Sequence, residues 1–515
     1  MQLLVAPVNS MTVTRNAGSD RSTISRLTDS PLLEPTPPNN VKNAFSAALV
    51  APVEATSIDR IDGPLLFVNN TTGVGWDENV ELRLSDGRTR HGVVVEVDDD
   101  LAIIEVYEGT EGIGTMGTAV AFSGSPLQLA VNERWLGRVV NGRGQPIDGG
   151  PTIDGSIRRP ITGSPMNPSQ RDVPRDPIIT GISAIDGLTT LVRGQKLPIF
   201  SEGGLPHLDL AIQIAAQATV EGSDFRVVFA GMGLTNADAD LVREGLDERI
   251  RTGDATLLLN TADDPVIERL LTPRLALTIA EHLAFDLDQH VLVILTDMTS
   301  YCDAVRQLSS ARGEVPSRRG YPGYLFSDLA SIYERCGRLR DHAGTITEIP
   351  VLTMPAGDIT HPVPDLTGYI TEGQIVLSSE LDANGNSPPI DVLSSLSRLM
   401  RRGAGPGRTR EDHLDIAAQV LSLLANARKA EDLATLIGRD ALSATEQRYL
   451  EFATCFDTDL LNQGPHESRS LQDTLNRAWA LISRMPIREL TMVTAEQLDR
   501  YRPGSDTAAP TIGNP

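Results

Sequence analysis

Short runs of alternating apolar and polar residues occupy the chain from about residue 56 to 124. The clearest are residues 80–84, 93–97 and 101–106, and the dipeptide Asp86-Gly87 lies between the first two. A period of two is typical of strands with one buried face, and Asp-Gly is a strong hairpin signal. This stretch therefore predicts a compact N-terminal β-barrel domain over residues 56–124.

From about residue 125 to 385 the pattern changes to apolar strands that alternate with helical stretches. Residues 226–230 and 291–295 are nearly continuous apolar runs. Such runs are typical of parallel strands that are buried on both faces. Residues 125–385 are therefore expected to form a central α/β domain, in which a parallel sheet carries helices on both faces.

Helical spacing of apolar residues dominates the region from 386 to 500. Ile416, Val420 and Leu423 recur at this spacing, and a second such stripe runs from residue 471 to 482. Ser470 and Asp473 before the second stripe resemble a capping box. The region predicts a C-terminal helical bundle, so the fold class is multidomain α/β with a barrel, a central sheet and this bundle.

Both ends of the chain lack sustained periodicity. Residues 1–55 are rich in Ser, Thr, Asn and Pro, and residues 501–515 in Gly, Pro, Ala and Thr, so both predict disordered tails.

A length of 515 residues is consistent with about three domains. No apolar run approaches the roughly 18 residues of a membrane span, and the opening residues lack the basic region of a secretory signal. A cytoplasmic protein is expected.

Cysteine usage and net charge narrow the function classes. Cys302, Cys336 and Cys455 show no metal-binding spacing and cannot all pair, which suits a reducing compartment and buried apolar roles. The formal net charge of -23 disfavours nucleic acid as a partner. The basic pairs Arg318-Arg319 and Arg401-Arg402 are interpreted as solvated loop ends or subunit contacts.

The most informative motif is a phosphate-binding loop that has lost its phosphate-binding residues. Residues 201–208 follow an apolar strand and precede an apolar helix, where a nucleotide loop belongs. A working loop reads G-x-x-x-x-G-K-[ST], because its lysine reaches phosphate oxygens and its hydroxyl holds Mg²⁺. The four diagnostic places here hold Ser201, Pro206, His207 and Leu208. The central domain is thus P-loop-NTPase-like with a degenerate P-loop, and it is not expected to be an ATPase alone.

Two further positions concern the same site. Asp297 ends the apolar strand 291–295, as the Mg²⁺-directed aspartate of a Walker B strand does, although a helix-capping acid is an equally good interpretation. A catalytic ATPase also needs a glutamate after the neighbouring strand, to polarise water. That place holds Gly231-Met232-Gly233, so the site lacks lysine, hydroxyl and base together.

Long stretches of the chain resemble one family. The chain looks like the B subunits, the non-catalytic, regulatory subunits of the V-type and archaeal (A-type) rotary ATPases, over about residues 56 to 500. The matching stretches are residues 181–188, 194–200, 318–324, 358–374 and 395–400. Ordered strings of this length are far more specific than a single loop motif.

The resemblance implies an assembly and one site residue. It implies a hexamer in which three B subunits alternate with three catalytic A subunits, attached to central and peripheral stalks of a cation-translocating complex. ATP or ADP with Mg would bind at the A–B interface, the metal held by A and no cofactor bound by this chain alone. In the family an arginine of the segment matching 395–400 acts on that nucleotide, and its counterpart is Arg398. The membrane would be reached only through the complex, on its cytoplasmic face.

The chain departs from the family pattern at two places. The family loop usually reads Ser-Gly-Ser-Gly-Leu-Pro-His, whereas Glu202 and Gly203 occupy its middle here, which is expected to place a repelling carboxylate at the phosphate position. A proline usually precedes the segment 395–400, and Ser394 replaces it, which predicts a less rigid segment. Neither departure affects Arg398.

Two other function classes fit the same architecture. One is a self-sufficient hexameric ATPase of the flagellar or secretion type, or an RNA translocase. His207 in place of lysine opposes both, and the acidic net charge opposes the translocase. The other is a purely architectural spacer subunit whose interface contributes no chemistry.

Overall fold

The structure is a computed structural model that describes residues 53–502, apart from residues 56, 70, 72 and 223. Residues 1–52 and 503–515, which make up nearly all of the two predicted tails, lie outside the described residues. The described residues belong to one compact unit of the chain. At the edge of the predicted amino-terminal tail, Val53–Ala55 already forms a strand, β1.

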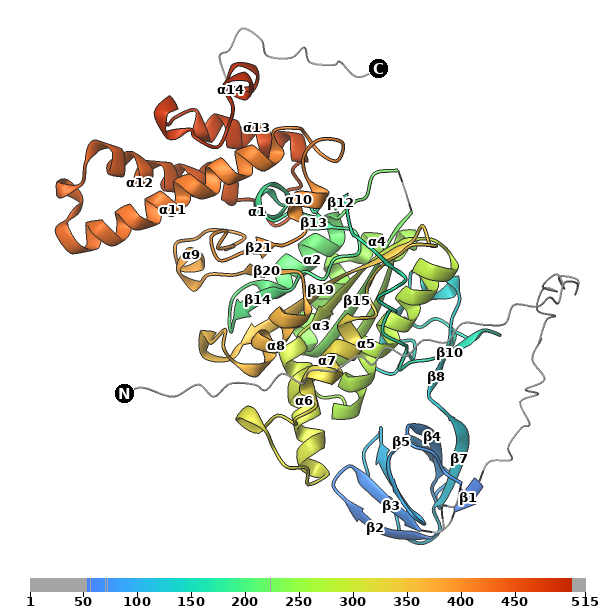
Figure 1. The fold of residues 1–515 in the computed structure, drawn as a ribbon. Helices are drawn as coiled ribbons and strands as arrows, with labels where there is room; N and C mark the ends of the chain where they lie inside the picture. The colour runs from blue at the N-terminus through green and yellow to red at the C-terminus, as the bar shows by residue number, and fades with distance from the viewer. Residues whose placement is uncertain (1–52, 56, 70, 72, 223, 503–515) are drawn as a thin grey trace, which may run out of the picture. The chain divides into compact units, whose positions relative to one another are not determined.

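An antiparallel sheet of seven strands curls around its own core at the amino-terminal end of the described chain (Figure 1). Its strands are β1, β2 (Ile58–Asp62), β3 (Leu65–Asn69), β4 (Glu78–Arg83), β5 (Thr89–Asp98), β6 (Leu101–Val106) and β7 (Ala119–Pro126). The predicted hairpin joins β4 and β5, and Gly87 takes the positive φ of 85° that its tight turn requires. Side chains that alternate inward, among them Val80, Leu82 and Val94, form the core.

The central domain is built on a mostly parallel sheet with the order β21-β20-β14-β19-β17-β15-β16-β9. These strands are β9 (Val139–Asn141), β14 (Ile199–Glu202), β15 (Phe225–Leu234), β16 (Ala255–Thr261), β17 (His290–Thr296), β19 (Thr345–Met354), β20 (Gly373–Val376) and β21 (Leu396–Ser397). Strand β21 pairs antiparallel with β20 at one edge. Small additional strands are β8 (Gln128–Ala130), β10 (Arg158–Pro160), β11 (Arg171–Asp172), β12 (Pro177–Ile178), β13 (Leu191–Val192) and β18 (Gly337–Leu339).

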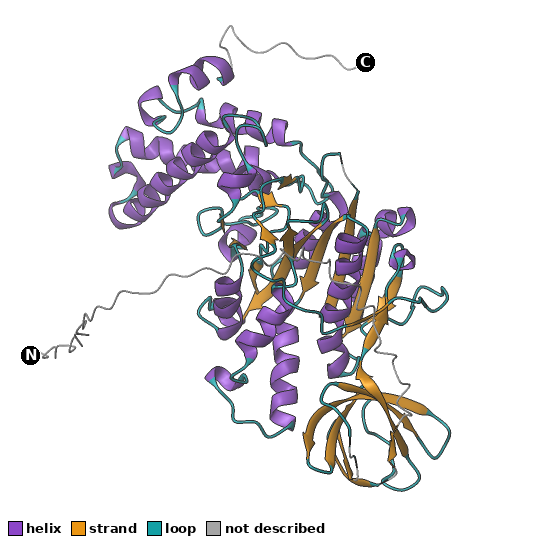
Figure 2. Ribbon diagram, turned by 45° about the vertical axis from the view of Figure 1, so that its right-hand side comes forward, coloured by secondary structure: helices purple, strands orange, loops and turns teal. Residues whose placement is uncertain are grey.

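Helices cover both faces of this sheet, as the apolar strand runs predict (Figure 2). The helices of the central domain are α1 (Ser183–Leu188), α2 (His207–Gln217), α3 (Asn236–Gly245), α4 (Asp247–Thr252), α5 (Val266–Glu281), α6 (Met298–Ala311), α7 (Leu325–Tyr333), α8 (Pro362–Ile370) and α9 (Ser379–Ala383). Leu292 and Ile294 of β17 pack into one core with α2 and α3. Val293 and Leu295 pack into a second core with α5 and α6. A strand with alternate residues in two cores must be apolar throughout.

The carboxyl-terminal helices share the first of these cores with α1 and α2. They are α10 (Met400–Gly403), α11 (His413–Ile437), α12 (Ala444–Phe456), α13 (Leu471–Ile482) and α14 (Ala495–Tyr501). The side chain of His413 bonds the Gly187 carbonyl of α1 at 3.0 Å. The hydroxyls of Ser183 and Thr474 lie 3.1 Å apart, so polar contacts also join α1 to α13.

The predicted capping box at α13 is only half present. The Ser470 side chain accepts a hydrogen bond from the Asp473 backbone N–H at 3.1 Å, as predicted. The reciprocal bond is missing because the Asp473 carboxylate pairs with Arg477, one turn further along the helix, at 2.8 Å.

The cysteines have the environments that the sequence predicts for small apolar residues. Cys302 and Cys336 are buried, and Cys455 is partly buried against the first core. All three thiols are free.

Within the described part of the chain, no helix combines the length and the apolar character needed to cross a membrane.

The fully buried carboxyl group of Glu348, on β19, makes stability depend on pH. Burial raises its pKa from 4.5 to about 7, against the opposing effects of the Cys336 thiol and the Lys196 ammonium. In the unfolded chain this carboxyl ionises near its ordinary pKa. Between about pH 4.5 and 7 the folded state therefore holds the extra proton, and stability must fall as pH rises through this window.

We expect Glu348→Gln to remove this loss, which is on the order of 3 kcal/mol at most. Thermal unfolding midpoints of variant and parent should be similar near pH 5, and the variant should be the more stable above pH 7. Exposed Glu451 supplies the control, since Glu451→Gln should follow the parent at every pH. A constant difference between Glu348→Gln and parent from pH 5 to 8 would contradict the prediction.

Candidate functional site: a degenerate P-loop and a distant arginine

The strand, turn and helix predicted for residues 197–216 are present. Strand β14 ends at Glu202, and α2 begins at His207 after a turn in which Gly204 has a φ of +91°. Pro206 occupies the N-cap of α2 and offers no backbone N–H. The backbone N–H of His207 is already bonded to the Leu205 carbonyl at 2.8 Å, and its ring Nδ1 lies 3.0 Å from the same oxygen. The turn therefore keeps the backbone form of a P-loop, but positions 206 and 207 offer no free backbone N–H.

The cavity beside this turn is acidic. It has a volume of about 530 Å³, and its lining includes His207 and four aspartates but no lysine or arginine among the described residues. The aspartates are Asp209, Asp238, Asp297 and Asp382. Because like charges repel, a cavity with this lining disfavours a triphosphate.

The prediction that Glu202 would repel a phosphate at this turn is wrong in its geometry. Glu202 is not among the cavity-lining residues. Its side chain lies against Gly357, where an added Cβ would come within 3.1 Å of the Glu202 Cδ. The acidic side chains that do line the cavity are those of the four aspartates.

Asp297 makes the helix-cap contacts of one of the two interpretations that its sequence context allows. It is the N-cap of α6, and its carboxylate accepts from the Thr299 N–H at 2.6 Å. The same carboxylate accepts from the hydroxyl of Thr353 at 2.6 Å and from its N–H at 3.2 Å. On neighbouring β15, Gly231 pairs in register with Thr296, so Gly231-Met232-Gly233 lies beside Asp297 without a carboxylate.

Arg398 follows the edge strand β21. Its N–H donates to the Glu372 carbonyl at 3.0 Å, and its Nη1 donates to the Thr371 carbonyl at 3.2 Å. The residue is exposed, and within the described residues its guanidinium forms no ion pair. A permanently charged planar group is thus tethered at one point while its remaining donors are free.

Arg398 is too far from the P-loop turn of its own chain to act there. Glu372 donates its N–H to the Lys196 carbonyl, which places Arg398 beside the start of β14. The turn at Gly203 lies seven residues further along, beyond the opposite end of that strand. At about 3.3 Å per residue the separation is roughly 20 Å.

Four residues with no role predictable from the sequence hold this edge together: Gln195, Lys196, Glu372 and Ser397. Gln195 donates through Nε2 to the Glu372 carbonyl and to the Ser397 hydroxyl, both at 3.0 Å. Lys196, only 2% exposed, lies 2.9 Å from the Glu372 carboxylate. Burial alone would lower the pKa of Lys196, but Glu372 and Glu334 outweigh it, so the pKa is raised. A lysine at the start of an apolar strand was the only sequence signal.

The segment before Arg398 is held by Asp391 rather than by a proline. The Asp391 carboxylate accepts from the Ser394 hydroxyl at 2.5 Å, from its N–H at 3.3 Å and from the Leu393 N–H at 3.0 Å. Proline at 394 could supply neither of the Ser394 donors. Hydrogen bonds thus restrain the segment that the sequence predicts to be less rigid.

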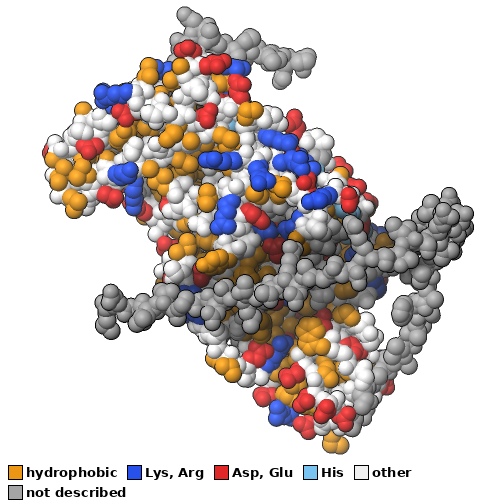
Figure 3. Space-filling view, viewed as in Figure 1, with side chains coloured by type: hydrophobic (Ala, Val, Ile, Leu, Met, Phe, Trp, Pro, Cys, Tyr) orange, Lys and Arg blue, Asp and Glu red, His pale blue; other side chains and the backbone are white. Residues whose placement is uncertain are grey.

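The two basic pairs differ in their surroundings. Arg318 pairs with Asp365 at 3.2 Å and Arg319 with Asp358 at 2.6 Å, so the chain itself compensates both charges. Arg401 and Arg402 are exposed on α10 and form no ion pair within the described chain. Lys and Arg side chains gather over the region of α10 and β21 on the face shown in Figure 3.

Three tyrosines in the stretches 318–324 and 358–374 differ in their burial. Tyr321 is 4% exposed and donates to Asp303 at 3.0 Å. Tyr324 is 40% and Tyr369 75% exposed.

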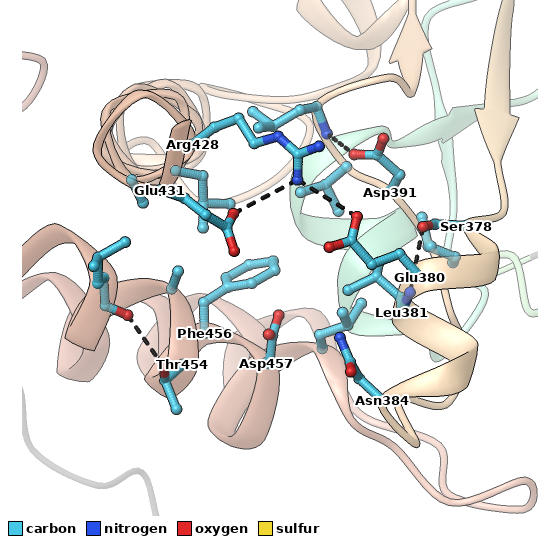
Figure 4. Close-up of a pocket in the computed structure, with 18 of the residues that line it drawn as sticks. Ser378, Glu380, Leu381, Asn384, Asp391, Arg428, Glu431, Thr454, Phe456 and Asp457 are labelled. Atoms are coloured by element: carbon cyan, nitrogen blue, oxygen red, sulfur yellow. Dashed lines mark hydrogen bonds and ion pairs between the residues drawn. The ribbon is translucent and has the colours of Figure 1, made fainter. Parts of the chain in front are cut away.

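A second cavity, of about 600 Å³, lies where residues 378–394 meet α11 and α12. Arg428 of α11 extends between Glu431 and Glu380, with Nη1 3.6 Å from a carboxylate oxygen of each (Figure 4). These side chains are more than half exposed, and ion pairs of this kind contribute little to stability. The cavity thus lies between the helical domain and the segment that precedes Arg398.

We expect Asp297→Ala to lower stability by about 1 to 2 kcal/mol, through the lost N-cap of α6. The thermal midpoint should fall by about 2 to 4 °C per kcal/mol, equally with and without Mg²⁺. Asp382→Ala, at an exposed position of the same cavity, should change it little. A Mg²⁺-dependent midpoint in the parent that disappears in Asp297→Ala would show metal binding instead.

Comparisons with known proteins match three successive parts of the chain. The model of the ATP synthase alpha/beta family, beta-barrel domain, matches residues 58–124, and that of the nucleotide-binding domain of the same family matches residues 181–397. The model of the C-terminal domain of V and A type ATP synthase matches residues 402–502. Together these matches cover the barrel, the sheet and the helical bundle.

Two individual proteins are similar over most of their length. The B subunit of the A-type ATP synthase of Aeropyrum pernix is 51% identical over 452 residues, which is 87% of this chain and 98% of that protein. The solved structure of an ATP synthase subunit, NeqB from Nanoarcheaum equitans, has a TM-score of 0.66 and 36% identity, covering 79% of this chain and 100% of that one. The chain therefore belongs to the ATP synthase alpha/beta family, among the B subunits of the V- and A-type ATP synthases.

Proposed function

We propose that this chain is the non-catalytic, regulatory B subunit of a cation-translocating V/A-type rotary ATP synthase or ATPase. Three copies alternate with three catalytic A subunits in a hexamer, and each donates Arg398 to the nucleotide at an A–B interface. ATP or ADP binds there with Mg, and the A subunit holds the metal and supplies the lysine and the base. The relative from Aeropyrum pernix carries the same subunit name, which supports this assignment.

The observation that carries the proposal is the position of Arg398. Its guanidinium is exposed, has no acidic partner within the described residues, and lies roughly 20 Å along β14 from the acidic P-loop turn of its own chain. A free cation at this edge can act on a phosphate only if another chain brings the phosphate to it.

The chemistry of phosphoryl transfer gives such a cation a defined task. Negative charge spreads over the γ-phosphoryl oxygens in the transition state, and a planar guanidinium can bind two of them at once. An arginine supplied across an interface contributes about 10³ to 10⁵ in rate, which is roughly 4 to 7 kcal/mol. The acidic cavity by the P-loop turn of this chain cannot offer this stabilisation. The nucleotide would therefore be bound by the A subunit, and this chain would supply only the arginine.

The same proposal assigns the remaining partners. The hexamer surrounds a central stalk and is held by peripheral stalks. The chain lies on the cytoplasmic face of the membrane and reaches it only through these subunits. Nucleic acid is not a partner, in keeping with the net charge of -23.

In the assembled complex, Arg398→Ala should leave assembly near normal and reduce ATP turnover about 10³-fold or more. Arg398→Lys should recover only part of this loss, because an ammonium cannot bind two oxygens in the same planar geometry. Turnover is measured at saturating Mg·ATP, and assembly by size-exclusion chromatography of the complex.

A matched control is Arg448→Ala, which removes an exposed arginine of α12 that has no ion pair within the described residues. It should keep turnover within about twofold of the parent. Turnover of Arg398→Ala within threefold of the parent would favour an architectural spacer. Multiple-turnover hydrolysis by the purified chain alone would favour a self-sufficient ATPase.

The isolated chain should bind Mg·ATP only weakly, with a dissociation constant above about 1 mM, because its cavity lacks a basic side chain. Calorimetric titration of the purified chain measures this. Micromolar binding of Mg·ATP that Gly204→Ala abolishes would place the nucleotide at the turn. It would contradict the proposal that only the A subunit binds the nucleotide.

A further inference from the structure

We propose that Lys196 is a positioning residue for Arg398, acting through Glu372. This inference rests on the proposed function of Arg398. It concerns how Arg398, which directly follows an edge strand of only two residues, is held in one geometry.

Lys196 and Glu372 are joined by three contacts. The Lys196 N–H donates to Oε2 of Glu372 at 2.8 Å, and its ammonium lies 2.9 Å from Oε1. In return the Glu372 N–H donates to the Lys196 carbonyl at 3.0 Å. Backbone and side chain of each residue therefore restrain the other, so the position of Glu372 is tied to the start of β14.

Glu372 in turn carries Arg398. The Glu372 carbonyl accepts the Arg398 N–H at 3.0 Å, and the preceding carbonyl, of Thr371, accepts the Arg398 guanidinium at 3.2 Å. Both restraints on Arg398 thus come from two adjacent residues, one of which Lys196 holds. A shift of this dipeptide would move the backbone and the guanidinium of Arg398 together.

Gln195 contacts both Glu372 and the residue before Arg398. Its Nε2 donates to the Glu372 carbonyl and to the hydroxyl of Ser397, the residue directly before Arg398. The Ser397 hydroxyl donates to the Thr190 carbonyl at 3.0 Å. Gln195 and Lys196, two consecutive residues that precede β14, therefore hold Glu372, which accepts the Arg398 N–H, and Gln195 also holds Ser397, which precedes Arg398.

The charge of Lys196 makes this restraint strong. The ammonium is buried, and its second partner is Glu334, with Oε1 at 3.2 Å. Glu334 lies after α7, and Arg171 also binds it. A buried cation that loses one of two carboxylates must rearrange toward the other. Loss of the Glu372 carboxylate would therefore pull Lys196 away from the Arg398 edge.

The two carboxylates offer a matched comparison. Glu372→Gln and Glu334→Gln each remove one acidic partner of the same ammonium, and the two side chains are exposed to similar extents, 30% and 34%. Only Glu372 touches the strand of Arg398. In the assembled complex, Glu372→Gln should lower kcat for ATP about 10- to 100-fold, since small misplacements of a catalytic group have effects of this size. Glu334→Gln should lower it at most threefold.

The decisive measurement repeats Glu372→Gln in the Arg398→Ala background, with thermal midpoints recorded for every variant. If Glu372 acts only through Arg398, the second substitution should cost less than twofold further in kcat. A full additional loss in that background, or equal losses for Glu372→Gln and Glu334→Gln, would overturn the positioning role. A silent Arg398→Ala would instead reject the proposed function itself.

Ser397→Ala provides a second variant if the Glu372→Gln complex does not assemble. It removes one buried hydroxyl that bonds Gln195 and Thr190. We expect it to lower kcat in the parent and to add nothing in the Arg398→Ala background. An effect that persists without Arg398 would again contradict the inference.

Discussion

The distribution of charge along strand β14 is the constraint on which the other features of the site depend. Beyond its carboxyl end, the turn at Gly203 opens into a cavity with four aspartates and no basic side chain. Beside its amino end, an arginine without an acidic partner within the described residues is tethered to backbone carbonyls. A phosphate group is repelled at the first place and attracted at the second. The strand thus separates the degenerate loop from Arg398, the residue that we propose acts on a nucleotide bound by another chain.

The sheet can hold these two ends apart because it is rigid and buried on both faces. Alternate residues of β17 belong to two different cores, one with α2 and α3 and the other with α5 and α6. Close-packed cores of this kind do not deform smoothly. The helical bundle adds to this, since α11 and α13 bond directly to α1 in the same core. The position of Arg398 therefore depends on the central domain as well as on its local contacts.

The sequence predicts the elements well and the side-chain contacts poorly, for physical reasons. Periodicity reports which faces are buried, so the β4–β5 hairpin and the continuous apolar strand β17 follow from it directly. Long ordered matches make Arg398 the candidate site residue, although nothing local distinguishes it from a solvated arginine. The direction of Glu202 was predicted wrongly because it depends on Gly357, which is distant in sequence. The role of Lys196 does not follow from the sequence for the same reason, since its partners Glu334 and Glu372 are brought to it only by the fold.

The shortness of β21 also bears on how the protein avoids unwanted association. An exposed sheet edge offers a row of unpaired N–H and C=O groups on which a foreign strand can grow, and long flat edges lead toward fibres. Here the outermost strand has two residues and is followed at once by arginine. Such an edge is too brief to template a further strand, and its charge opposes stacking of identical copies. Side-chain contacts can therefore form at this sheet edge without the risk of edge-to-edge aggregation.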